Sequence, residues 1–325
     1  MAGSIAEFHP GLRFATPDAI AQAAALLARG RLVAFPTETV YGLGADATDE
    51  SAVVGIFAAK GRPRFNPLIA LVGGLDEASA HGAFDGTARA LAEAFWPGPL
   101  TLVVPARPGC RIALMARAGL DSVALRAPAH PVARALIAQA GRPLAAPSAN
   151  RSGRISPTRA AAAAEELGSA VDMILDGGAC EVGVESTIVA CVGGAPALLR
   201  SGGVPRAAIE AVIGRALAKA EGDSDAPLAP GRLASHYAPR ARVRLGARSL
   251  LPGEAGLDFG GAFGGAPRTL DLSPGRDLRE AAANLFAHLR ALDALAPAAI
   301  AVAPIPGEGL GEAIVDRLAR AAAER

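Results

Sequence analysis

Short apolar runs and stretches in which apolar residues recur at helical spacing follow one another along most of this chain. The sequence Thr16-Pro17-Asp18 is typical of a helix N-terminus, and helical spacing continues from it to a stop at Gly30. The apolar run 31–35 predicts a buried strand that leads into a loop at Pro36. Similar signals predict helices at 50–60 and 87–95, and from Pro131, Pro157 and Pro205 onward.

Further short apolar runs predict strands at 67–72, 100–104, 123–126, 144–146, 171–175, 186–191 and 197–200. Strands and helices are interleaved without a strict alternation of strand, helix and strand. We therefore expect an α/β fold with a twisted, open, mixed sheet rather than a purely parallel one.

A polar, charged segment with Pro and Gly, residues 218–240, predicts a linker. Beyond it, strands and helices are expected again, at 243–245, 278–295, 299–303 and 311–323. A chain of 325 residues is long enough for two domains with separate cores. We expect a first domain over 1–217, a linker over 218–240 and a small α/β domain over 241–325.

The composition excludes several classes of protein. Hydrophobic residues make up 51% of the chain and aromatic residues 4%, so the cores must be mainly aliphatic. A net charge of +1 argues against bulk electrostatic binding to nucleic acid or to an anionic membrane. A local basic groove is still compatible with this charge.

The three cysteines, Cys110, Cys180 and Cys191, lack CxxC spacing and indicate neither a disulfide framework nor a zinc site, so no metal site is predicted. Sparse cysteine fits a cytoplasmic location. The N-terminus carries charges and prolines where a signal peptide needs an apolar segment, and no apolar run has membrane-spanning length.

A basic loop follows the predicted helix 50–60. Lys60, Arg62 and Arg64 alternate with Gly61 and Pro63, and the loop ends at Asn66. Such alternating cations suit an anion with several charges, such as a polyphosphate. The alternative is a solvated helix C-terminus, where cations complement the helix dipole.

Lysine is rare in this chain, which singles out Lys60. Only two of the 32 basic residues are lysine, and the other, Lys219, lies in the polar linker. An ammonium is a compact point charge that a planar guanidinium does not replace. We therefore expect Lys60 to be functional.

Residues 42–47, Gly-Leu-Gly-Ala-Asp-Ala, match the letters of the dinucleotide-binding pattern GxGxxG/A, but their context does not. Six residues separate the strand from the first glycine, and the acidic residue expected further on is missing. The sequence also has no GxxxxGK[ST] loop. Neither a Rossmann cofactor site nor a P-loop is expected in this region.

Hydroxyl and cationic side chains gather where predicted strands end. Ser148 and Asn150 are two residues apart and point the same way in an extended segment, whereas Ser156 suits a helix N-cap or a phosphate contact. Arg126 and Arg200 each end an apolar strand. Because these groups recur at several strand ends, we expect one shared anion-binding cleft.

Seven motifs, in order, resemble one family. They are PTETVYGLGADA, KGRPRFNPL, WPGPLT, VALRAP, APSANRSG with ISPT, GVESTIV and LLRSGGV, and they resemble the YrdC-type threonylcarbamoyl-AMP synthases over roughly residues 15–215. The element SHYAP and the tail resemble the long form of that family. The resemblance implies a sheet with a basic concave cleft and a small Rossmann-like C-terminal domain.

The resemblance also implies an activity. The enzyme would condense L-threonine, bicarbonate and ATP into threonylcarbamoyl-AMP and pyrophosphate, with ATP as substrate and Mg²⁺ accompanying the nucleotide. The product would serve the modification of the adenosine beside the tRNA anticodon, by hand-off to a tRNA threonylcarbamoyl transferase. No membrane partner is expected, and direct binding of tRNA is left open.

Site residues follow from the resemblance by position. Catalytic roles are implied for Lys60 and Arg62. The implied ATP contacts are Lys60, Arg62, Asn66, Ser122, Ser148, Asn150, Ser156, Arg200 and Tyr237. The implied threonine contacts are Thr39, Arg126, the backbone of Ala146 and Ser186.

Two positions leave alternatives open. The family carries a histidine where this chain has Leu71, so either the threonine pocket is rearranged or another hydroxy-amino acid is used. Tyr237 in the linker is either a lid over the nucleotide or an anchor that packs the linker onto a domain.

Two other functions are compatible with the residues. One is an RNA-binding module with a basic concave face, although scarce aromatic residues argue against it. The other is a related ATP-dependent carbamoyl-adenylate enzyme with a different acceptor.

Overall fold

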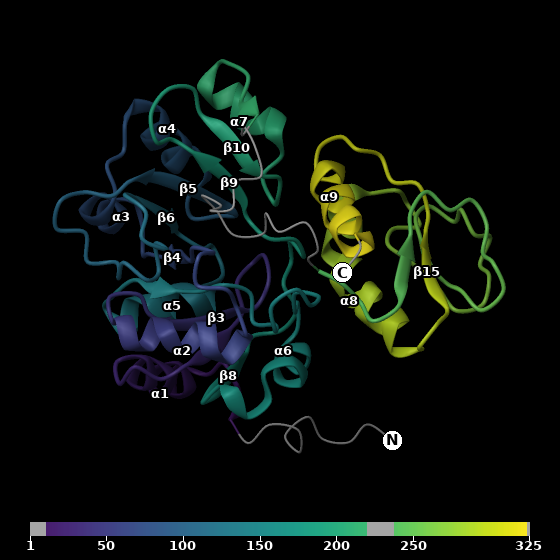
Figure 1. Ribbon diagram of the computed structural model, residues 1–325, viewed down its shortest axis with the longest axis horizontal. Coiled ribbons are helices and arrows are strands. Elements are labelled where there is room, and N and C mark those ends of the chain that lie inside the picture. The colour runs from purple at the N-terminus through teal and green to yellow at the C-terminus, as the bar shows by residue number, and fades with distance from the viewer. Residues whose placement is uncertain (1–10, 220–236, 324–325) are drawn as a thin grey trace.

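The computed structural model describes residues 11–219 and 237–323, which form a large lobe and a small lobe (Figure 1). The strands of the large lobe form an eleven-stranded sheet in the order β1-β8-β2-β3-β7-β4-β6-β5-β9-β10-β11. Their bounds are β1 Leu12–Phe14, β2 Val33–Phe35, β3 Gly42–Asp46, β4 Ile69–Leu71, β5 Leu100–Pro105, β6 Ser122–Arg126, β7 Leu144–Ala145, β8 Met173–Asp176, β9 Thr187–Ala190, β10 Ala197–Arg200 and β11 Ala218–Lys219.

The large sheet is mixed, which confirms the predicted fold class. Parallel pairs such as β2–β8, β4–β6 and β5–β9 alternate with antiparallel pairs such as β2–β3 and β5–β6. Strand β8 lies between β1 and β2, so the sheet unites segments far apart in the chain.

Helices pack on both faces of this sheet. Their bounds are α1 Pro17–Leu27, α2 Glu50–Lys60, α3 Leu75–His81, α4 Gly86–Phe95, α5 Pro131–Ala140, α6 Ala160–Leu167 and α7 Arg206–Ile213. Successive residues of a strand point to opposite faces. Accordingly Ile69 and Leu71 of β4 join an aliphatic cluster with α1 and α5, whereas Ala70 joins a second cluster with α2, α4 and α6.

Local sequence signals fix the ends of the helix that precedes the basic loop. The Asp49 side chain accepts hydrogen bonds from the backbone N–H groups of Ser51 and Ala52, at 2.9 and 3.3 Å, and so caps α2. Gly61 ends the helix with φ at 59°, a left-handed conformation that glycine adopts without strain. The basic loop therefore leaves α2 in a defined direction.

The predicted helix start at Pro157 is wrong, because α6 begins at Ala160. The backbone carbonyls of Pro157 and Thr158 accept hydrogen bonds from the N–H groups of Tyr41 and Cys180, at 2.8 and 3.0 Å. These contacts with distant segments hold the stretch extended. Ser156 is consequently not a helix N-cap.

The glycine-rich stretch after Pro36 forms a strand, β3, where the sequence predicted a loop. A Cβ atom on Gly44 would lie 2.5 Å from Cε1 of Phe35 in the neighbouring strand. Glycine therefore permits close strand packing here, although its strand propensity is low. The sequence also gave no prediction for β1 or α3.

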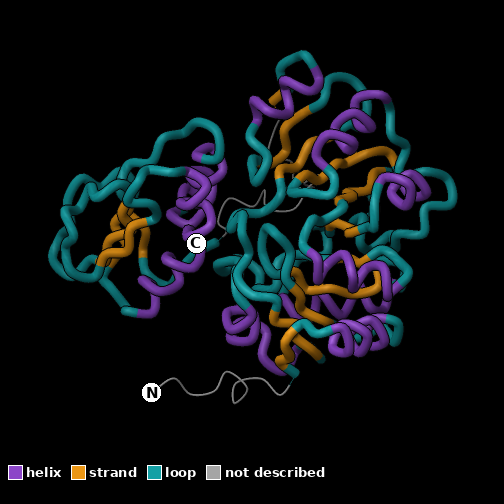
Figure 2. Tube along the Cα trace, turned by 180° about the vertical axis from the view of Figure 1, so that it is seen from behind, coloured by secondary structure: helices purple, strands orange, loops and turns teal. Residues whose placement is uncertain are grey.

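The small lobe contains a parallel sheet in the order β12-β15-β13-β14, which confirms the predicted second α/β domain. Its elements are β12 Arg242–Arg244, β13 Ala255–Asp258, β14 Thr269–Asp271, α8 Leu278–Ala294, β15 Ala299–Val302 and α9 Gly311–Ala322. Strands β13 and β14 were not predicted. Figure 2 shows α8 and α9 on the side of this lobe that faces the large lobe.

The two lobes share a buried interface. Val40, Ile155 and Val184 of the large lobe belong to the same apolar cluster as the core of the small lobe. Gly183 approaches α8 so closely that an added Cβ atom would lie 2.2 Å from the carbonyl oxygen of Ala282. The large lobe therefore docks α8 and α9 directly.

The predicted domain boundaries at 217 and 240 stay predictions, since residues 220–236 lie outside the described residues. Among the residues that the structure does describe, no helix combines the length and the apolar character needed to cross a bilayer.

Candidate active site

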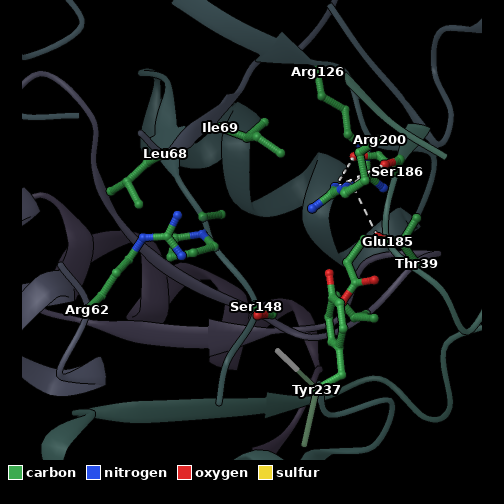
Figure 3. Close-up of a pocket in the computed structure, with 13 residues that line it drawn as sticks. Thr39, Arg62, Leu68, Ile69, Arg126, Ser148, Glu185, Ser186, Arg200 and Tyr237 are labelled. Atoms are coloured by element: carbon green, nitrogen blue, oxygen red, sulfur yellow. Dashed lines mark hydrogen bonds between the residues drawn. The ribbon is translucent and has the colours of Figure 1, made fainter. Parts of the chain in front are cut away.

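A pocket with about 500 Å³ of space, part of it open to solvent, lies where the ends of several strands of the large sheet meet Tyr237 (Figure 3). Eight of the predicted site residues line it, namely Thr39, Arg62, Arg126, Ala146, Ser148, Ser186, Arg200 and Tyr237. The other lining residues are Val40, Leu68, Ile69, Pro147 and Glu185. The structure thus unites most of the cleft that the sequence predicted.

Arg126 is buried at one end of the pocket and is held on three sides. Its Nη2 lies 2.8 Å from Oε1 of Glu38, its Nη1 donates to the Thr39 hydroxyl at 3.0 Å, and its Nε donates to the Gly98 carbonyl at 3.2 Å. Burial alone would raise the pKa of Glu38, but the charge of Arg126 and the hydrogen bonds to the carboxylate together outweigh burial, and the pKa is lowered. The pair is therefore ionic, and Arg126 has a fixed direction.

Ser186 and Arg200 form a second polar group in the pocket. The Arg200 guanidinium donates twice to the Ser186 carbonyl, at 2.9 and 3.1 Å, and once to the Ser186 hydroxyl, at 3.2 Å. That hydroxyl also lies 2.8 Å from the hydroxyl of Thr101. Both residues are buried, so a cation and a hydroxyl are held together with little solvent.

Arg62 stabilises the basic loop from within. Its Nε donates to the Asn66 carbonyl at 3.3 Å, and its Nη2 donates to the Pro67 carbonyl at 3.0 Å. Burial, together with the charge of Arg200, lowers the pKa of Arg62 to about 10. The guanidinium stays cationic at neutral pH and lines the pocket.

Lys60 is buried but is not among the residues that line the pocket. Its ammonium donates to the carbonyls of Ser148, at 2.5 Å, and of Asn150. The Lys60 carbonyl in turn accepts from the N–H of Ser152 at 2.8 Å. Burial, reinforced by the charge of Arg62, lowers the pKa of Lys60 well below its usual value. Lys60 thus fastens the polar loop 148–152 to the end of α2.

Asn66 and Asn150 are buried beside this group. In the part of the chain that the structure describes, the side-chain oxygen of each has no hydrogen-bond partner. The Asn150 side-chain nitrogen donates to the carbonyls of Arg151 and Arg154, at 2.8 and 2.9 Å. A buried acceptor without a donor is costly and indicates a place where a ligand supplies one.

Ser122 and Ser156 also lie outside the pocket lining. The Ser156 hydroxyl donates to Oε1 of Glu185 at 2.6 Å. Ser122 begins β6, whose register with β4 places it beside the end of the basic loop. Contact of either serine with a nucleotide stays a prediction.

Three charged residues of the site were missed by the sequence analysis, namely Glu38, Glu185 and Arg317. Glu185 accepts from Nε of Arg317 at 2.8 Å, across the interface of the lobes. A signal for Arg317 does exist in the sequence. It occupies the apolar face of α9 together with Ile314 and Leu318, where a charge requires a buried partner.

Tyr237 has contacts that fit both alternatives left open by the sequence, an anchor for the linker and a cover for the nucleotide. Its ring is 1% exposed and stacks on Phe286 of α8, with centroids 5.5 Å apart, so it anchors the chain to the small lobe. The same ring lines the pocket. The preceding residue, His236, lies outside the described residues.

Leu71, the position where the resembled family carries histidine, is 2% exposed and pairs with Arg126 across β4 and β6. It packs in the aliphatic cluster with α1 and α5 and does not line the pocket. The core, rather than the pocket lining, therefore surrounds this leucine.

Comparisons with known proteins agree over most of the chain. Residues 25–202 match a family model described as "Telomere recombination", and residues 204–323 match one described as "Threonylcarbamoyl-AMP synthase, C-terminal domain". The threonylcarbamoyl-AMP synthase of Bacillus subtilis is 41% identical, over 94% of this chain and 93% of that protein. The enzyme of the same name from Pyrococcus abyssi is 41% identical, over 93% of this chain and 94% of that protein.

A solved structure supports the same assignment. The structure described as P. abyssi Sua5 complexed with L-threonine superposes with a TM-score of 0.88, at 38% identity, and covers 96% of both chains. Sequence and fold therefore agree over both lobes. The chain belongs to the threonylcarbamoyl-AMP synthase family.

Proposed function

We propose that the pocket around Arg62, Arg126 and Arg200 makes threonylcarbamoyl-AMP and pyrophosphate from L-threonine, bicarbonate and ATP. The observation that carries this proposal is the convergence of three buried guanidiniums on one pocket, in a chain of this family. A carboxylate at one end and a triphosphate at the other would balance these charges. The comparisons support an enzyme rather than an RNA-binding module.

Threonine would occupy the end of the pocket at Arg126. The guanidinium would bind its carboxylate, and the hydroxyls of Thr39 and Ser186 would contact its polar groups. The N–H of Ala146 already donates to the Ile69 carbonyl at 3.0 Å, so its backbone would contact threonine through the carbonyl. Because Glu38 fixes Arg126, the carboxylate would be bound in one orientation.

ATP would occupy the end at Arg62, Ser148 and Arg200. Asn66 and Asn150 would supply their unpaired oxygens to donors of the nucleotide, and Ser122, Ser156 and Tyr237 complete the proposed contacts. Lys60 would act by holding the loop of Ser148 and Asn150 in place.

The reaction would proceed in two steps. The threonine amino nitrogen bonds to the bicarbonate carbon and water leaves, which gives a carbamate. A carbamate oxygen then attacks the α-phosphorus in line, and the bond to pyrophosphate breaks. Such a transfer depends on positioning and charge neutralisation. Arg62 and Arg200 would stabilise the charge that moves onto pyrophosphate, and no histidine is among the described residues that line the pocket.

Magnesium would arrive with the nucleotide. Glu38 and Glu185 each pair with an arginine, so neither is available as a ligand. No group of three metal-ligating side chains occurs among the described residues. Release of the product to a tRNA threonylcarbamoyl transferase is part of the proposal, and the cytoplasmic location stays a prediction.

The test is pyrophosphate release from ATP and bicarbonate, scanned over amino acids. We expect release to depend on L-threonine and on bicarbonate. Equal release with another hydroxy-amino acid would favour the related enzyme with a different acceptor.

Substituting Arg126 tests the assignment of threonine and ATP to the two ends of the pocket. Arg126→Ala should raise the KM for threonine and leave the KM for ATP little changed, whereas Arg62→Ala should do the reverse. Arg126→Lys should rescue poorly, because an ammonium cannot make a bidentate contact with a carboxylate. A higher KM for ATP alone in Arg126→Ala would mean that the proposed ends are exchanged.

A further inference from the structure

We propose that Arg317, in the last helix of the small lobe, is a positioning residue for the active site in the large lobe. This inference rests on the proposed function. It assigns the C-terminal domain a direct part in the reaction, through one side chain that reaches across the interface and fixes residues that line the pocket.

Arg317 is fully charged yet only 1% exposed, and its guanidinium is bonded on every side. Nε donates to Oε2 of Glu185 at 2.8 Å, Nη2 donates to the Ser201 carbonyl at 2.9 Å, and Nη1 donates to Oδ2 of Asp316 at 2.5 Å. Its central carbon lies 5.1 Å from the centre of the Tyr237 ring. Two of these partners, Glu185 and Tyr237, line the pocket.

The contacts fall on two segments that carry proposed substrate contacts, Ser186 and Arg200. The N–H of Gly203 donates to the Glu185 carbonyl at 3.0 Å, and Arg200 binds the Ser186 carbonyl, so the segments form one unit. Arg317 holds one segment through the Glu185 side chain and the other through the Ser201 carbonyl. Losing it would release Ser186 and Arg200 together.

Charge gives Arg317 a second effect. Among the described residues that line the pocket, only Glu185 is acidic. ATP and the carbamate formed from threonine and bicarbonate are anions, so an unpaired Glu185 carboxylate would repel them in a site with little solvent. Arg317 neutralises this carboxylate through its bond to Oε2. Figure 3 shows Glu185 beside Tyr237, the other pocket residue that Arg317 contacts.

Arg290 offers a matched control. It lies on α8 and crosses the same interface, to Oε1 of Glu166 at 3.0 Å and to the Ile155 carbonyl at 2.7 Å. Neither partner lines the pocket. Substituting Arg290 therefore removes an arginine that joins the lobes without removing a contact to any residue that lines the pocket.

The experiment compares the full-length chain with Arg317→Met and Arg290→Met. The measurements are kcat, the KM values for ATP and threonine from pyrophosphate release, and the midpoint of thermal unfolding. We expect Arg317→Met to lose about 10²-fold in kcat/KM, the scale of a small misplacement of reacting groups. Arg290→Met should keep kcat/KM even where its unfolding midpoint falls. In the double variant Arg317→Met/Glu185→Gln, removal of the unpaired charge should lower both KM values relative to Arg317→Met alone.

Three results would overturn the inference. They are an unchanged kcat/KM in Arg317→Met, an equal loss in Arg290→Met, and a double variant no better than Arg317→Met. If Arg317→Met does not fold, the double variant is compared with Glu185→Gln alone, and equal kcat/KM values would then overturn it. A wild-type chain without threonine-dependent release would instead contradict the proposed function.

Discussion

The ammonium of Lys60 lies against two carbonyls rather than in the pocket lining, which defines what its substitution tests. Lys60→Ala leaves the carbonyls of Ser148 and Asn150 without a donor and frees their loop. We expect kcat/KM for ATP to fall by about 10²-fold while the fold persists. Lys60→Arg should not restore it, because a planar guanidinium does not fit where one compact charge meets two carbonyls.

Arg64 provides the control for this prediction. It belongs to the same basic loop but is exposed. Arg64→Ala should keep its activity, as measured by pyrophosphate release. Full activity in Lys60→Arg would instead show that any cation at position 60 is sufficient.

Protonation of Glu185 should make the free energy of unfolding depend on pH in the acidic range. Burial raises its pKa, but the charges of Arg317 and Arg200 and two hydrogen bonds outweigh burial and lower the pKa to about 2, from 4.5. A carboxyl whose pKa is lower in the folded state contributes stability that is present above the unfolded pKa. That contribution should disappear as the pH falls from about 4.5 to about 2.

Urea unfolding at a series of pH values measures this effect. In Glu185→Gln the decline below pH 4.5 should be shallower than in the wild type, because the titrating group is gone. Identical slopes of unfolding free energy against pH in the wild type and in Glu185→Gln would mean that another group causes the loss of stability in acid.

At the scale of elements, the site depends on two segments whose backbones touch. A Cβ atom on Gly202 would lie 2.3 Å from the Glu185 carbonyl oxygen and 2.4 Å from backbone atoms of Ser186 and Thr187. Gly202→Ala should therefore push the segments apart and lower the free energy of unfolding by about 1–3 kcal/mol, together with activity.

Gly86→Ala is the comparison for Gly202→Ala. Gly86 begins α4, and an added Cβ atom there would have no neighbour within 4 Å. Its variant should match or exceed the wild type in unfolding free energy, since alanine favours helices. Chemical denaturation of both variants decides the matter, and equal stability would mean that the two segments can separate freely.

Elements with strong local signals could be predicted from the sequence. Thr16 and Pro17 predict the start of α1, and Pro131 begins α5 as predicted. The stretch after Pro157 could not be predicted, because its carbonyls are bonded to Tyr41 and Cys180, which only the fold brings near. Strand β3 could not be predicted for a similar reason. Glycine fits at position 44 because Phe35 of the neighbouring strand lies so close, and its own strand propensity gives no such signal.

The candidate site could likewise be predicted only in part from the sequence. Arg126 and Arg200 follow from the pattern of cations at strand ends and Arg62 from the basic loop after α2, and the structure brings all three together. Two carboxylates do not follow from the pattern, because Glu38, which orients Arg126, and Glu185, which pairs with Arg317, acquire their roles from partners distant in the chain. Motifs thus reveal which residues meet the ligand but not which residues hold them.

At the scale of the whole molecule, the structure revises the expected effect of truncation. If Tyr237 covered the nucleotide as a lid by itself, a chain ending after Arg242, which keeps Tyr237, would recover activity over one ending after Leu217. Tyr237 rests on Phe286 and Arg317 of the small lobe, and neither truncated chain contains them. We therefore expect the two truncated chains to be equally weak in converting ATP to AMP.

Full-length Phe286→Ala tests the same support without truncation. It removes the ring under Tyr237 and should lower activity in the same direction, as measured by pyrophosphate release. Higher activity in the longer truncated chain would show that the tyrosine works without its support.

The position of β8 between β1 and β2 has a consequence for synthesis on the ribosome. Residues 12–14 and 33–35 cannot complete their sheet until residues 173–176 have emerged. At about 5–20 residues per second, these early strands wait for roughly 10–30 s with open edges. Such edges pair readily with other chains. The nascent chain would therefore expose these edges to chaperones until β8 has emerged, and the contact of Glu185 with Arg317 can form only after the small lobe has been synthesised.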